Sequence, residues 1–258
     1  MKRILITGGL GFIGGALIDR LLEDKENYIF NIDKLNIESN LYRLNSFNKT
    51  KRHKHFQIDL INQSRVKNVL EEAKPDLIIH LAAESHVDRS LKEPRKFIES
   101  NIIGTLNLLE LTRIFSPNAP FIFMSTNKVY GDNPNFLPLM EKKTRWEIKE
   151  NHKFYQGINE KMSIDDCTHS FFGVSKVYSD LIVQEYGKNI GLKTSCFRAG
   201  CITGPNHSGA QLHGFLSYLV KICLKKKKYN LIGYKGKQVR DNIPVSYTHL
   251  TLPTSSWV

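Results

Sequence analysis

The feature of this chain that most constrains its fold is a short, β-branched strand that runs directly into a glycine-rich turn and then into an apolar helix. The segment from Lys2 to Gly14 reads K-R-I-L-I-T-G-G-L-G-F-I-G. In such a turn the first glycine permits the bend, the second lets the backbone approach phosphates, and the third lets helix and strand pack closely. The free N–H groups of the helix N-terminus then face an anion. The pattern predicts that a dinucleotide pyrophosphate is bound by Gly8, Gly11, Phe12, Ile13 and Gly14.

An acidic residue, Asp33, ends the second predicted strand at the distance from the turn that a dinucleotide site requires. A carboxylate there accepts hydrogen bonds from the adenosine ribose hydroxyls and disfavours a 2′-phosphate. The expected cofactor is therefore NAD and not NADP. The alternative is a glycine-rich turn without a ligand, but the strand, the helix and the acid all favour the cofactor.

The bulk composition limits the class of protein. The chain has 258 residues, 41% of them hydrophobic, which suits one large domain or one domain with a smaller lobe. Its four cysteines show no C-x-x-C spacing and no paired histidines, so neither a disulfide framework nor a metal site is expected. Glycines interrupt the N-terminal apolar run, and no run reaches the roughly 20 apolar residues of a membrane helix. We expect a soluble, cytoplasmic protein without a membrane partner.

The formal net charge is +12, and four lysines follow one another from Lys225 to Lys228. Such charge could attract nucleic acid, but no nucleic-acid-binding motif accompanies it. We expect a solvated basic face and no nucleic-acid partner. Part of the charge would also attract a substrate that carries a diphosphate.

Apolar runs alternate with segments of helical periodicity as far as Ser125. The predicted strands are Lys2–Thr7, Tyr28–Asp33, His55–Asp59, Leu77–Leu81 and Phe121–Ser125, and the predicted helices are Phe12–Asp24, Ser64–Ala73 and Arg95–Phe115. This alternation predicts an α/β fold with a doubly wound parallel sheet. Ligands bind beyond the carboxyl ends of the strands in such sheets. The residues that follow each strand are therefore the candidates for a site.

A long polar segment, Asn133–Asp166, separates this region from the last predicted elements. A loop of this length is usually functional or disordered. A helix, His169–Asn189, and a strand, Lys193–Phe197, are predicted after it. We expect Gly204–Asn242 to begin a smaller lobe over the carboxyl edge of the sheet.

Several motifs together resemble the extended short-chain dehydrogenase/reductases of the NAD-dependent epimerase/dehydratase family. They are T-G-G-L-G-F-I-G from Thr7, H-L-A-A-E-S-H-V-D-R-S from His80, N-I-I-G-T from Asn101, S-T-N-K-V-Y-G from Ser125, S-K at Ser175 and R-D-N-I from Arg240. The resemblance covers about Met1 to Ile243. It implies a Rossmann domain that binds NAD over residues 1–200 and a truncated substrate lobe over residues 201–243. It also implies a nucleotide-diphosphate sugar as substrate and a homodimer formed by the two long helices.

The resemblance divides between two subfamilies. As far as Leu111 the chain resembles dTDP-glucose 4,6-dehydratases, and from about Pro120 it resembles CDP-paratose 2-epimerases. The dehydratases carry an Asp-Glu pair that removes water from the sugar, whereas this chain has Asn127 and Lys128. An amide cannot donate a proton as a carboxylic acid does, and an ammonium cannot act as a carboxylate base. We therefore expect an epimerase that acts by transient oxidation, with a dehydratase or a non-catalytic binding protein as alternatives.

The resemblance also implies the residues of the reaction. Family members use a Y-x-x-x-K motif, in which tyrosine takes the hydroxyl proton and lysine lowers its pKa and binds the nicotinamide ribose. Here Lys176 matches the lysine, but the tyrosine position is Phe172, so the base is unassigned. Thr126 or Ser125 matches the residue that holds the hydroxyl. We hypothesise that Tyr155 reaches in from the long loop as the base, because Tyr178 lies two residues past Lys176 and points away.

Further contacts follow from the same resemblance, each with a simpler alternative. The expected cofactor contacts are Asp59, Leu60, Ala82, Ala83 and Ser125, although Asp59 could form a turn and the alanines could serve packing alone. The expected substrate contacts are Glu84, Ser85, His86, Asn206, His207 and Arg240, although His86 could be an exposed loop residue. Arg240 is the strongest candidate, because a guanidinium binds phosphate oxygens in a bidentate manner.

The family pattern ends near Ile243. The last residues read P-V-S-Y-T-H-L-T-L-P-T-S-S-W-V. We hypothesise that Pro244–Val258 is a non-native tail. The change of subfamily between Leu111 and Pro120 raises the further hypothesis that the chain is a chimera.

Overall fold

We analysed a computed structural model of the chain, which describes residues 1–36, 39–209, 214–231 and 233–246. Its centre is a parallel sheet of six strands in the order β3-β2-β1-β4-β5-β8. The strands are β1 Lys2–Thr7, β2 Asn27–Asp33, β3 His53–Gln57, β4 Leu77–His80, β5 Phe121–Thr126 and β8 Thr194–Ala199. The predicted α/β fold with a doubly wound parallel sheet is confirmed.

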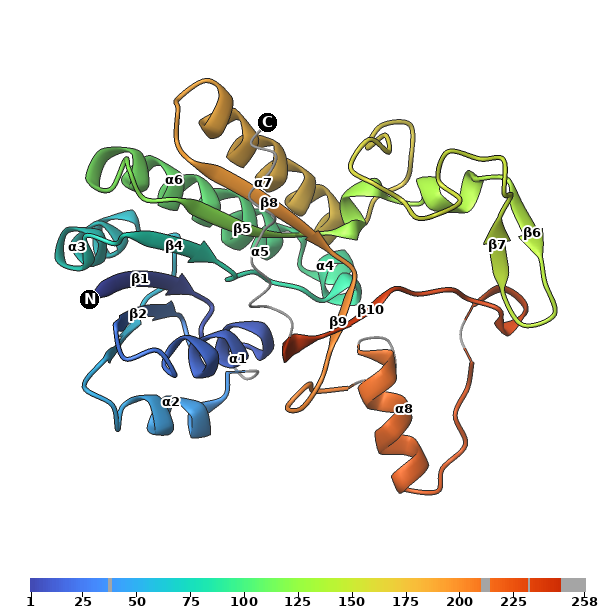
Figure 1. The fold of residues 1–258 in the computed structure, drawn as a ribbon, viewed down its shortest axis with the longest axis horizontal. Coiled ribbons are helices and arrows are strands. Elements are labelled where there is room, and N and C mark those ends of the chain that lie inside the picture. The colour runs from blue at the N-terminus through green and yellow to red at the C-terminus, as the bar shows by residue number, and fades with distance from the viewer. Residues whose placement is uncertain (37–38, 210–213, 232, 247–258) are drawn as a thin grey trace.

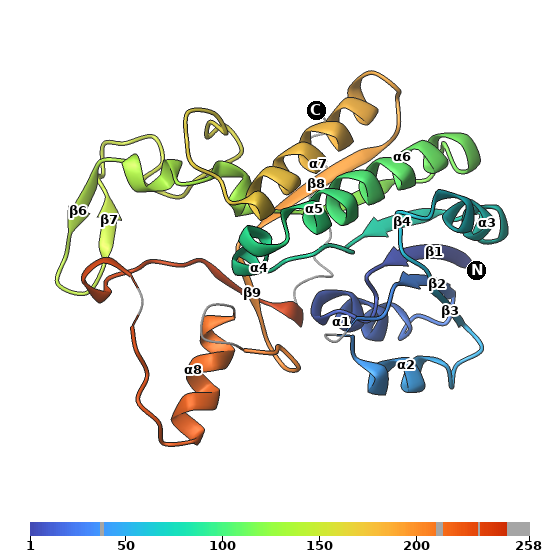
Figure 2. The ribbon, with the colours of Figure 1, turned by 180° about the vertical axis from the view of Figure 1, so that it is seen from behind.

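Helices cover both faces of the sheet (Figures 1 and 2). On one face, α1 (Phe12–Leu21) and α2 (Leu41–Phe47) pack against β1, β2 and β4 through an apolar cluster that includes Ile4, Ile18 and Phe47. On the other face, α3 (Gln63–Ala73), α6 (Gly104–Phe115) and α7 (Phe171–Lys188) form a second cluster over the strands. The two buried clusters fix the positions of the strand ends that form the site.

Side chains cap three of these helices at the positions where the chain changes direction. Asn40, Asn62 and Ser170 accept hydrogen bonds from the backbone N–H groups of Arg43, Arg65 and Gly173 at 3.0 to 3.1 Å. Each bond satisfies one of the free N–H groups of a first helical turn. Lys74 ends α3 in the left-handed region, with φ of 39°.

The predicted helix Arg95–Phe115 differs from expectation in its middle. A π-helical segment, Ile98–Ile103, lies between α5 (Pro94–Phe97) and α6. The carbonyl oxygen of Asn101 accepts hydrogen bonds from the hydroxyls of Thr105 at 2.6 Å and Ser179 at 2.8 Å. Ser179 is on α7, so a tertiary contact accompanies the wider turn, as is common for π-bulges near functional sites.

Three α-helices of the described chain were not predicted, and several boundaries shift. They are α2, α4 (Val87–Lys92) and α8 (Phe215–Leu224). Strand β3 begins two residues earlier than expected and β8 ends two residues later. The long polar segment contains an antiparallel hairpin, β6 (Leu139–Glu141) and β7 (Trp146–Ile148), and two short 3-10 helices frame its start, Asn127–Tyr130 and Asn133–Phe136.

A smaller lobe lies beyond the carboxyl ends of the sheet strands (Figure 1). It contains β9 (Cys201–Thr203), α8 (Phe215–Leu224), a 3-10 turn at Tyr234–Gly236 and β10 (Asn242–Pro244), which pairs in parallel with β9. Val245 is buried and packs against Gly204. The start of the predicted tail thus belongs to the described lobe, whereas residues 247–258 lie outside the described residues. Among the described helices, none is both long and apolar enough to cross a membrane.

Candidate active site

A cleft of about 2450 Å³ lies where the strand ends meet the smaller lobe. Segments that follow β1, β2, β3, β4, β5 and β8 line it. The strand order reverses between β1 and β4, which is where open α/β sheets bind ligands. Pockets for one small ligand span roughly 300 to 1,000 Å³. The cleft is therefore larger than a site for one small ligand requires.

The glycine-rich turn forms one wall of this cleft. Gly8 has φ of +74°, and a Cβ there would lie 2.7 Å from the backbone nitrogen of Ala82. A Cβ on Gly14 would lie 2.2 Å from the carbonyl oxygen of Gly8. Gly11, Phe12 and Ile13 complete this wall, and Gly11 provides no side-chain cap to the N-terminus of α1. The turn thus brings bare backbone to the cleft, as a pyrophosphate site requires.

Asp33 lies beside the turn, at the end of β2. Its Oδ2 accepts a hydrogen bond from the backbone N–H of Leu10 at 3.0 Å, and its Oδ1 accepts one from Leu35 at 3.0 Å. A carboxylate oxygen has further lone pairs, and Asp33 lines the cleft. The geometry is therefore compatible with the predicted contact with an adenosine ribose.

An ion-pair network continues from Asp33 along the cleft. The Nζ of Lys34 donates to Glu84 Oε1 at 2.8 Å and to Ser100 at 3.1 Å, and lies 3.7 Å from Asp59 Oδ2. Asp59 and its neighbour Leu60 both line the cleft, as do Ala82 and Ala83. The predicted cofactor contacts are thus brought to one wall.

Glu84, a predicted substrate contact, lies behind this wall. Its side chain is 6% exposed and is held by Lys34, while its backbone bonds the amide side chain of Asn101 at 2.8 and 3.0 Å. The neighbours Ser85 and His86 line the cleft, but Glu84 does not belong to the wall that the described residues form. Burial and the ion pair with Lys34 place the Glu84 side chain behind the wall, and its contact with a substrate stays a prediction.

The two hydroxyls at the end of β5 have different environments. Ser125 donates its hydroxyl to Asp180, which is buried on α7. Thr126 caps the following 3-10 helix, and its Oγ1 accepts a hydrogen bond from the backbone N–H of Lys128 at 3.3 Å. Of the two candidates for holding a substrate hydroxyl, Thr126 is the better placed, because the Ser125 hydroxyl is directed into the interior.

Lys176 lies on α7 beneath the same strand end. Its Nζ donates to the carbonyl oxygen of Met124 at 2.6 Å and lies 4.1 Å from the centroid of the Phe123 ring. Burial lowers the pKa of Lys176 to about 7, so its proton is held weakly at neutral pH. Phe172, one turn earlier, is buried in edge-to-face contact with Phe97, and both Phe172 and Lys176 line the cleft.

Asn127 and Lys128, which the sequence resemblance matches to the acid pair of the dehydratases, also line the cleft. Burial and the guanidinium of Arg240 lower the pKa of Lys128, while Cys201 and Asp241 act in the opposite direction. Arg240 is exposed and reaches this wall from the smaller lobe. Two cationic side chains, Lys128 and Arg240, therefore lie near one another at this wall.

The two tyrosines that were considered as the base differ in position: one lines the cleft and the other does not. Tyr155 lines the cleft from the long loop but is 45% exposed, and its hydroxyl forms no hydrogen bond with the part of the chain that the structure describes. Tyr178 is on the outer face of α7 and is not among the described lining residues, as expected. The assignment of Tyr155 as a base stays a prediction.

Asn206 and His207 line the cleft from the smaller lobe. The ring of His207 stacks on that of Phe12, with centroids 4.4 Å apart and planes inclined by 14°. The predicted substrate contacts of the lobe thus lie close to the predicted cofactor turn.

Two buried polar groups near the site were missed by sequence reasoning. Asp180 accepts from Arg198 at 2.9 and 3.0 Å, and Arg198 also donates to the hydroxyl of Tyr130 at 3.1 Å. His80 bonds the hydroxyls of Thr7 at 2.6 Å and Thr105 at 2.9 Å, and burial lowers its pKa to about 3. Both residues, Asp180 and His80, are titratable and stand within otherwise apolar segments. This pattern could have indicated buried, partnered groups, since such residues are seldom buried without a partner.

The sequence of this chain is similar to a known protein family and to curated proteins within it. The model of the NAD dependent epimerase/dehydratase family matches residues 4–246. A dTDP-glucose 4,6-dehydratase of Salmonella typhimurium is 32% identical over 255 residues, covering 93% of this chain. The chain spans only 64% of that relative's length.

Solved structures with a similar fold include two that are in complex with NAD. A dTDP-glucose 4,6-dehydratase from Bacillus anthracis in complex with NAD has a TM-score of 0.73 and 26% identity, over 95% of this chain and 68% of its own. A UDP-glucose 4-epimerase from Thermus thermophilus, also in complex with NAD, has a TM-score of 0.74 and 26% identity, over 95% of this chain and 71% of its own.

Proposed function

The chain belongs to the NAD dependent epimerase/dehydratase family, and from this premise we propose that it binds NAD and oxidises a ring hydroxyl of a nucleotide-diphosphate sugar. The observation that carries the proposal is the convergence of the glycine-rich turn, Asp33, Thr126 and Lys176 on one large cleft. The bare turn and the carboxylate fit the pyrophosphate and adenosine ribose of a dinucleotide. The remaining volume, with Arg240 at its rim, suits an anionic sugar nucleotide.

In this proposal residues that line the cleft bind and orient the two ligands. NAD, when bound, supplies a hydride acceptor that takes hydride from the ring carbon and can return it. Thr126 orients the sugar hydroxyl by a hydrogen bond, and Lys176 contacts the nicotinamide ribose. Arg240 binds the diphosphate, because its guanidinium matches phosphate oxygens. The hydroxyl proton must leave as the carbonyl forms, which requires a base.

Two side chains are candidates for that base. Tyr155 could approach from the loop, while Lys176 already lies in the cleft with a pKa of about 7. An amine with this pKa is partly neutral at pH 7 and can accept a proton. Unchanged turnover in Tyr155→Phe would leave Lys176 as the base, whereas a loss of at least 100-fold, with NAD binding retained, would support Tyr155.

The step that follows oxidation of the sugar distinguishes two candidate functions, dehydration and epimerisation. The relatives described above include a dTDP-glucose 4,6-dehydratase with 32% identity, so the comparisons support dehydration better than a CDP-paratose 2-epimerase reaction. Asn127 and Lys128 favour epimerisation, because neither can act as the carboxylic acid and carboxylate that dehydration uses. We propose the shared oxidation step as the function, followed by return of hydride without loss of water.

A turnover assay decides between these candidates. The chain is incubated with NAD and, separately, dTDP-glucose, CDP-paratose and UDP-glucose, and the products are identified by mass and NMR. Epimerisation gives a product of unchanged mass, whereas dehydration gives a 4-keto-6-deoxy sugar that is lighter by one water and absorbs ultraviolet light in alkali. The variant Asn127→Asp/Lys128→Glu is expected to gain dehydration, and dehydration by the unsubstituted chain would overturn the epimerase proposal.

A non-catalytic binding protein is the remaining alternative, because Phe172 occupies the tyrosine position. Calorimetry would then detect binding of NAD without turnover of any of the three sugar nucleotides. Detectable turnover excludes this alternative. Failure to bind NAD would overturn the proposed function itself.

A further inference from the structure

A histidine of the smaller lobe contacts the first helical residue of the glycine-rich turn. His207 stacks on Phe12 at 4.4 Å in a nearly parallel arrangement. Phe12 begins α1, so its backbone N–H lies at the helix end that faces a dinucleotide pyrophosphate. The contact therefore joins the lobe to the predicted phosphate site.

The backbone on both sides of the stack is shaped for it. His207 donates its backbone N–H to Gly204 at 3.2 Å, which closes a tight turn in which Asn206 has φ of +66°. A Cβ on Gly214 would lie 2.8 Å from the His207 ring, so the backbone of Gly214, immediately before α8, approaches the ring closely. Burial lowers the pKa of His207, and a neutral ring stacks well on phenyl.

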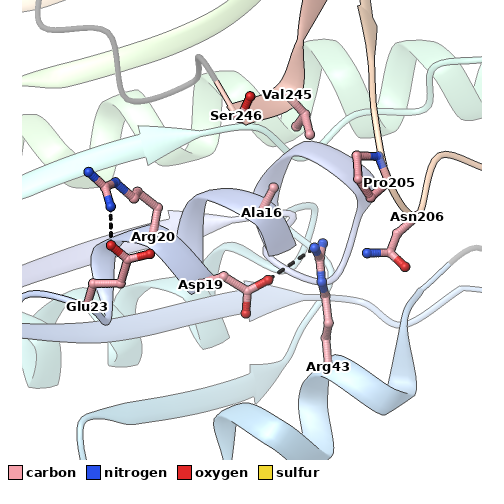
Figure 3. Close-up of a pocket in the computed structure, with 9 residues that line it drawn as sticks. All are labelled: Ala16, Asp19, Arg20, Glu23, Arg43, Pro205, Asn206, Val245 and Ser246. Carbon is pink, nitrogen blue, oxygen red and sulfur yellow. Dashed lines mark hydrogen bonds and ion pairs between the residues drawn. The ribbon is translucent and has the colours of Figure 1, made fainter.

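Phe12 is also fixed from its other side. Arg43 donates to the carbonyl oxygen of Phe12 at 3.4 Å and forms an ion pair with Asp19 at 3.1 Å (Figure 3). The ring that receives His207 thus belongs to a restrained turn of helix. A restrained partner makes the stack an effective anchor for the lobe.

Next to the stack, a hollow lies between α1 and the 204–208 turn of the smaller lobe. This hollow of about 530 Å³ is lined by residues of α1, by Arg43, by Pro205 and Asn206, and by Val245 and Ser246 (Figure 3). The turn is therefore not packed continuously along α1. The stack of His207 on Phe12 is thus a contact that joins the lobe turn to α1, while Val245 packs against Gly204 at the start of the same turn.

We propose that His207 is a positioning residue that holds the 204–208 turn across the pyrophosphate end of the cleft and thereby slows release of NAD. Phe12, His207, Ser208 and Gly214 all line the same cleft. In this proposal a dinucleotide on the glycine-rich turn leaves past this segment, and its release is faster when the stack is open. The inference rests on the proposed function, because it concerns the cofactor that the proposal places there.

The test measures release of NADH from the purified chain without any sugar nucleotide. NADH fluorescence is followed by stopped flow after mixing with excess NAD, for the unsubstituted chain, His207→Ala and His207→Phe. Aromatic pairs contribute roughly 0.5 to 1.5 kcal/mol, which corresponds to about 2- to 12-fold in a rate constant. His207→Ala is expected to release NADH faster within this range, and His207→Phe to stay within about twofold of the unsubstituted chain because stacking is retained.

A matched control removes another histidine that lies beside a phenylalanine. His152 lies 5.6 Å from Phe154 and does not line the cleft in the described structure, so His152→Ala should leave NADH release unchanged. Thermal unfolding of each variant identifies any that is misfolded. Release from a folded His207→Ala at the unsubstituted rate overturns the inference, as does equally fast release from His207→Phe. An unsubstituted chain that binds no NADH overturns the proposed function as well.

Discussion

At the scale of single residues, Asp180 is the most deeply buried acid near the site, with 1% of its side chain exposed. Arg198 donates to both of its carboxylate oxygens, and Ser125 and Gln184 complete its shell. Asp180 is on α7 and Arg198 on β8, so the pair joins a helix to the edge of the sheet. Removal of one partner from a buried pair leaves an uncompensated charge.

We expect Arg198→Met to lower the free energy of unfolding by about 3 kcal/mol, because it strands the Asp180 carboxylate in the interior. The measurement is urea unfolding followed by circular dichroism. Arg113→Met removes an exposed pair with Glu110 and should destabilise the chain much less, because water screens exposed ion pairs. Arg198→Met/Asp180→Leu should recover most of the loss, and equal costs for the two single arginine variants would contradict the role of the buried pair.

His53 makes stability depend on pH. It is 7% exposed, neither ring nitrogen has a hydrogen-bond partner in the described part of the chain, and its ring lies 5.2 Å from Phe47. Burial, assisted by His55, lowers its pKa from 6.5 to about 4. Between these values the unfolded chain binds more protons than the folded chain. The contribution of His53 is therefore fully present above pH 6.5 and is lost as pH falls toward 4.

The expected loss from this one residue between pH 7 and pH 5 is about 2 kcal/mol. Urea unfolding at the two pH values measures it. His53→Phe should flatten the dependence by that amount, while His80, also buried with a low pKa, retains its own contribution. His152→Gln, in the long loop, should keep the original dependence. An unchanged slope in His53→Phe would show that His53 is not the group that titrates.

At the scale of elements, the β1–turn–α1 unit has little space for side chains. A Cβ at Gly14 would approach backbone atoms of Gly8 and Gly9 at 2.2 and 2.7 Å. Gly14→Ala must therefore displace the turn, and we expect NAD affinity to fall at least about tenfold, since the backbone loses its approach to the phosphates. Calorimetric titration with NAD measures the change.

The control for this prediction is a glycine that the site does not need. Gly191 has φ of +82°, and a Cβ there would have no atom within 4 Å, so Gly191→Ala costs backbone strain of about 1 kcal/mol but creates no clash. It should lower stability without weakening NAD binding. Parallel losses of NAD affinity in both variants would indicate that general destabilisation is responsible.

Sequence patterns predicted the elements whose structure depends on residues close together in the chain. The strand and glycine turn at Lys2–Gly14, the acid at Asp33 and the alternation of strands and helices are local, and the fold and family they predicted are confirmed. The π-helical segment was not predictable, because the hydroxyl that meets Asn101 comes from Ser179, 78 residues later. The pairing of Asp180 with Arg198 and the burial of Glu84 under Lys34 likewise depend on contacts between distant segments.

At the scale of the whole molecule, α7 presents an apolar stripe outward. Phe171, Val174, Tyr178 and Leu181 recur at intervals of three and four residues and are 38% to 51% exposed. This spacing places them on one face of the helix. Leu91 and Ile98, on neighbouring elements that pack near α7, are 63% and 46% exposed and extend the apolar surface. An exposed apolar area of this kind marks an interaction surface.

We expect this surface to join two copies of the chain, since a twofold axis would pair each α7 stripe with its counterpart and remove both from water. Light scattering coupled to gel filtration at micromolar concentration should give the mass of a dimer. Leu181→Glu should give a monomer, because a self-facing stripe would bury the new carboxylate twice without a partner. Leu224→Glu is the matched control, because Leu224 ends α8 and is 81% exposed. Helix α8 lies away from α7 in both views (Figures 1 and 2). Dissociation of the dimer by Leu181→Glu alone assigns the interface to the outer face of α7. Dissociation by Leu224→Glu alone would show that the interface lies elsewhere. An unsubstituted chain that is monomeric would show that the chain forms no such dimer.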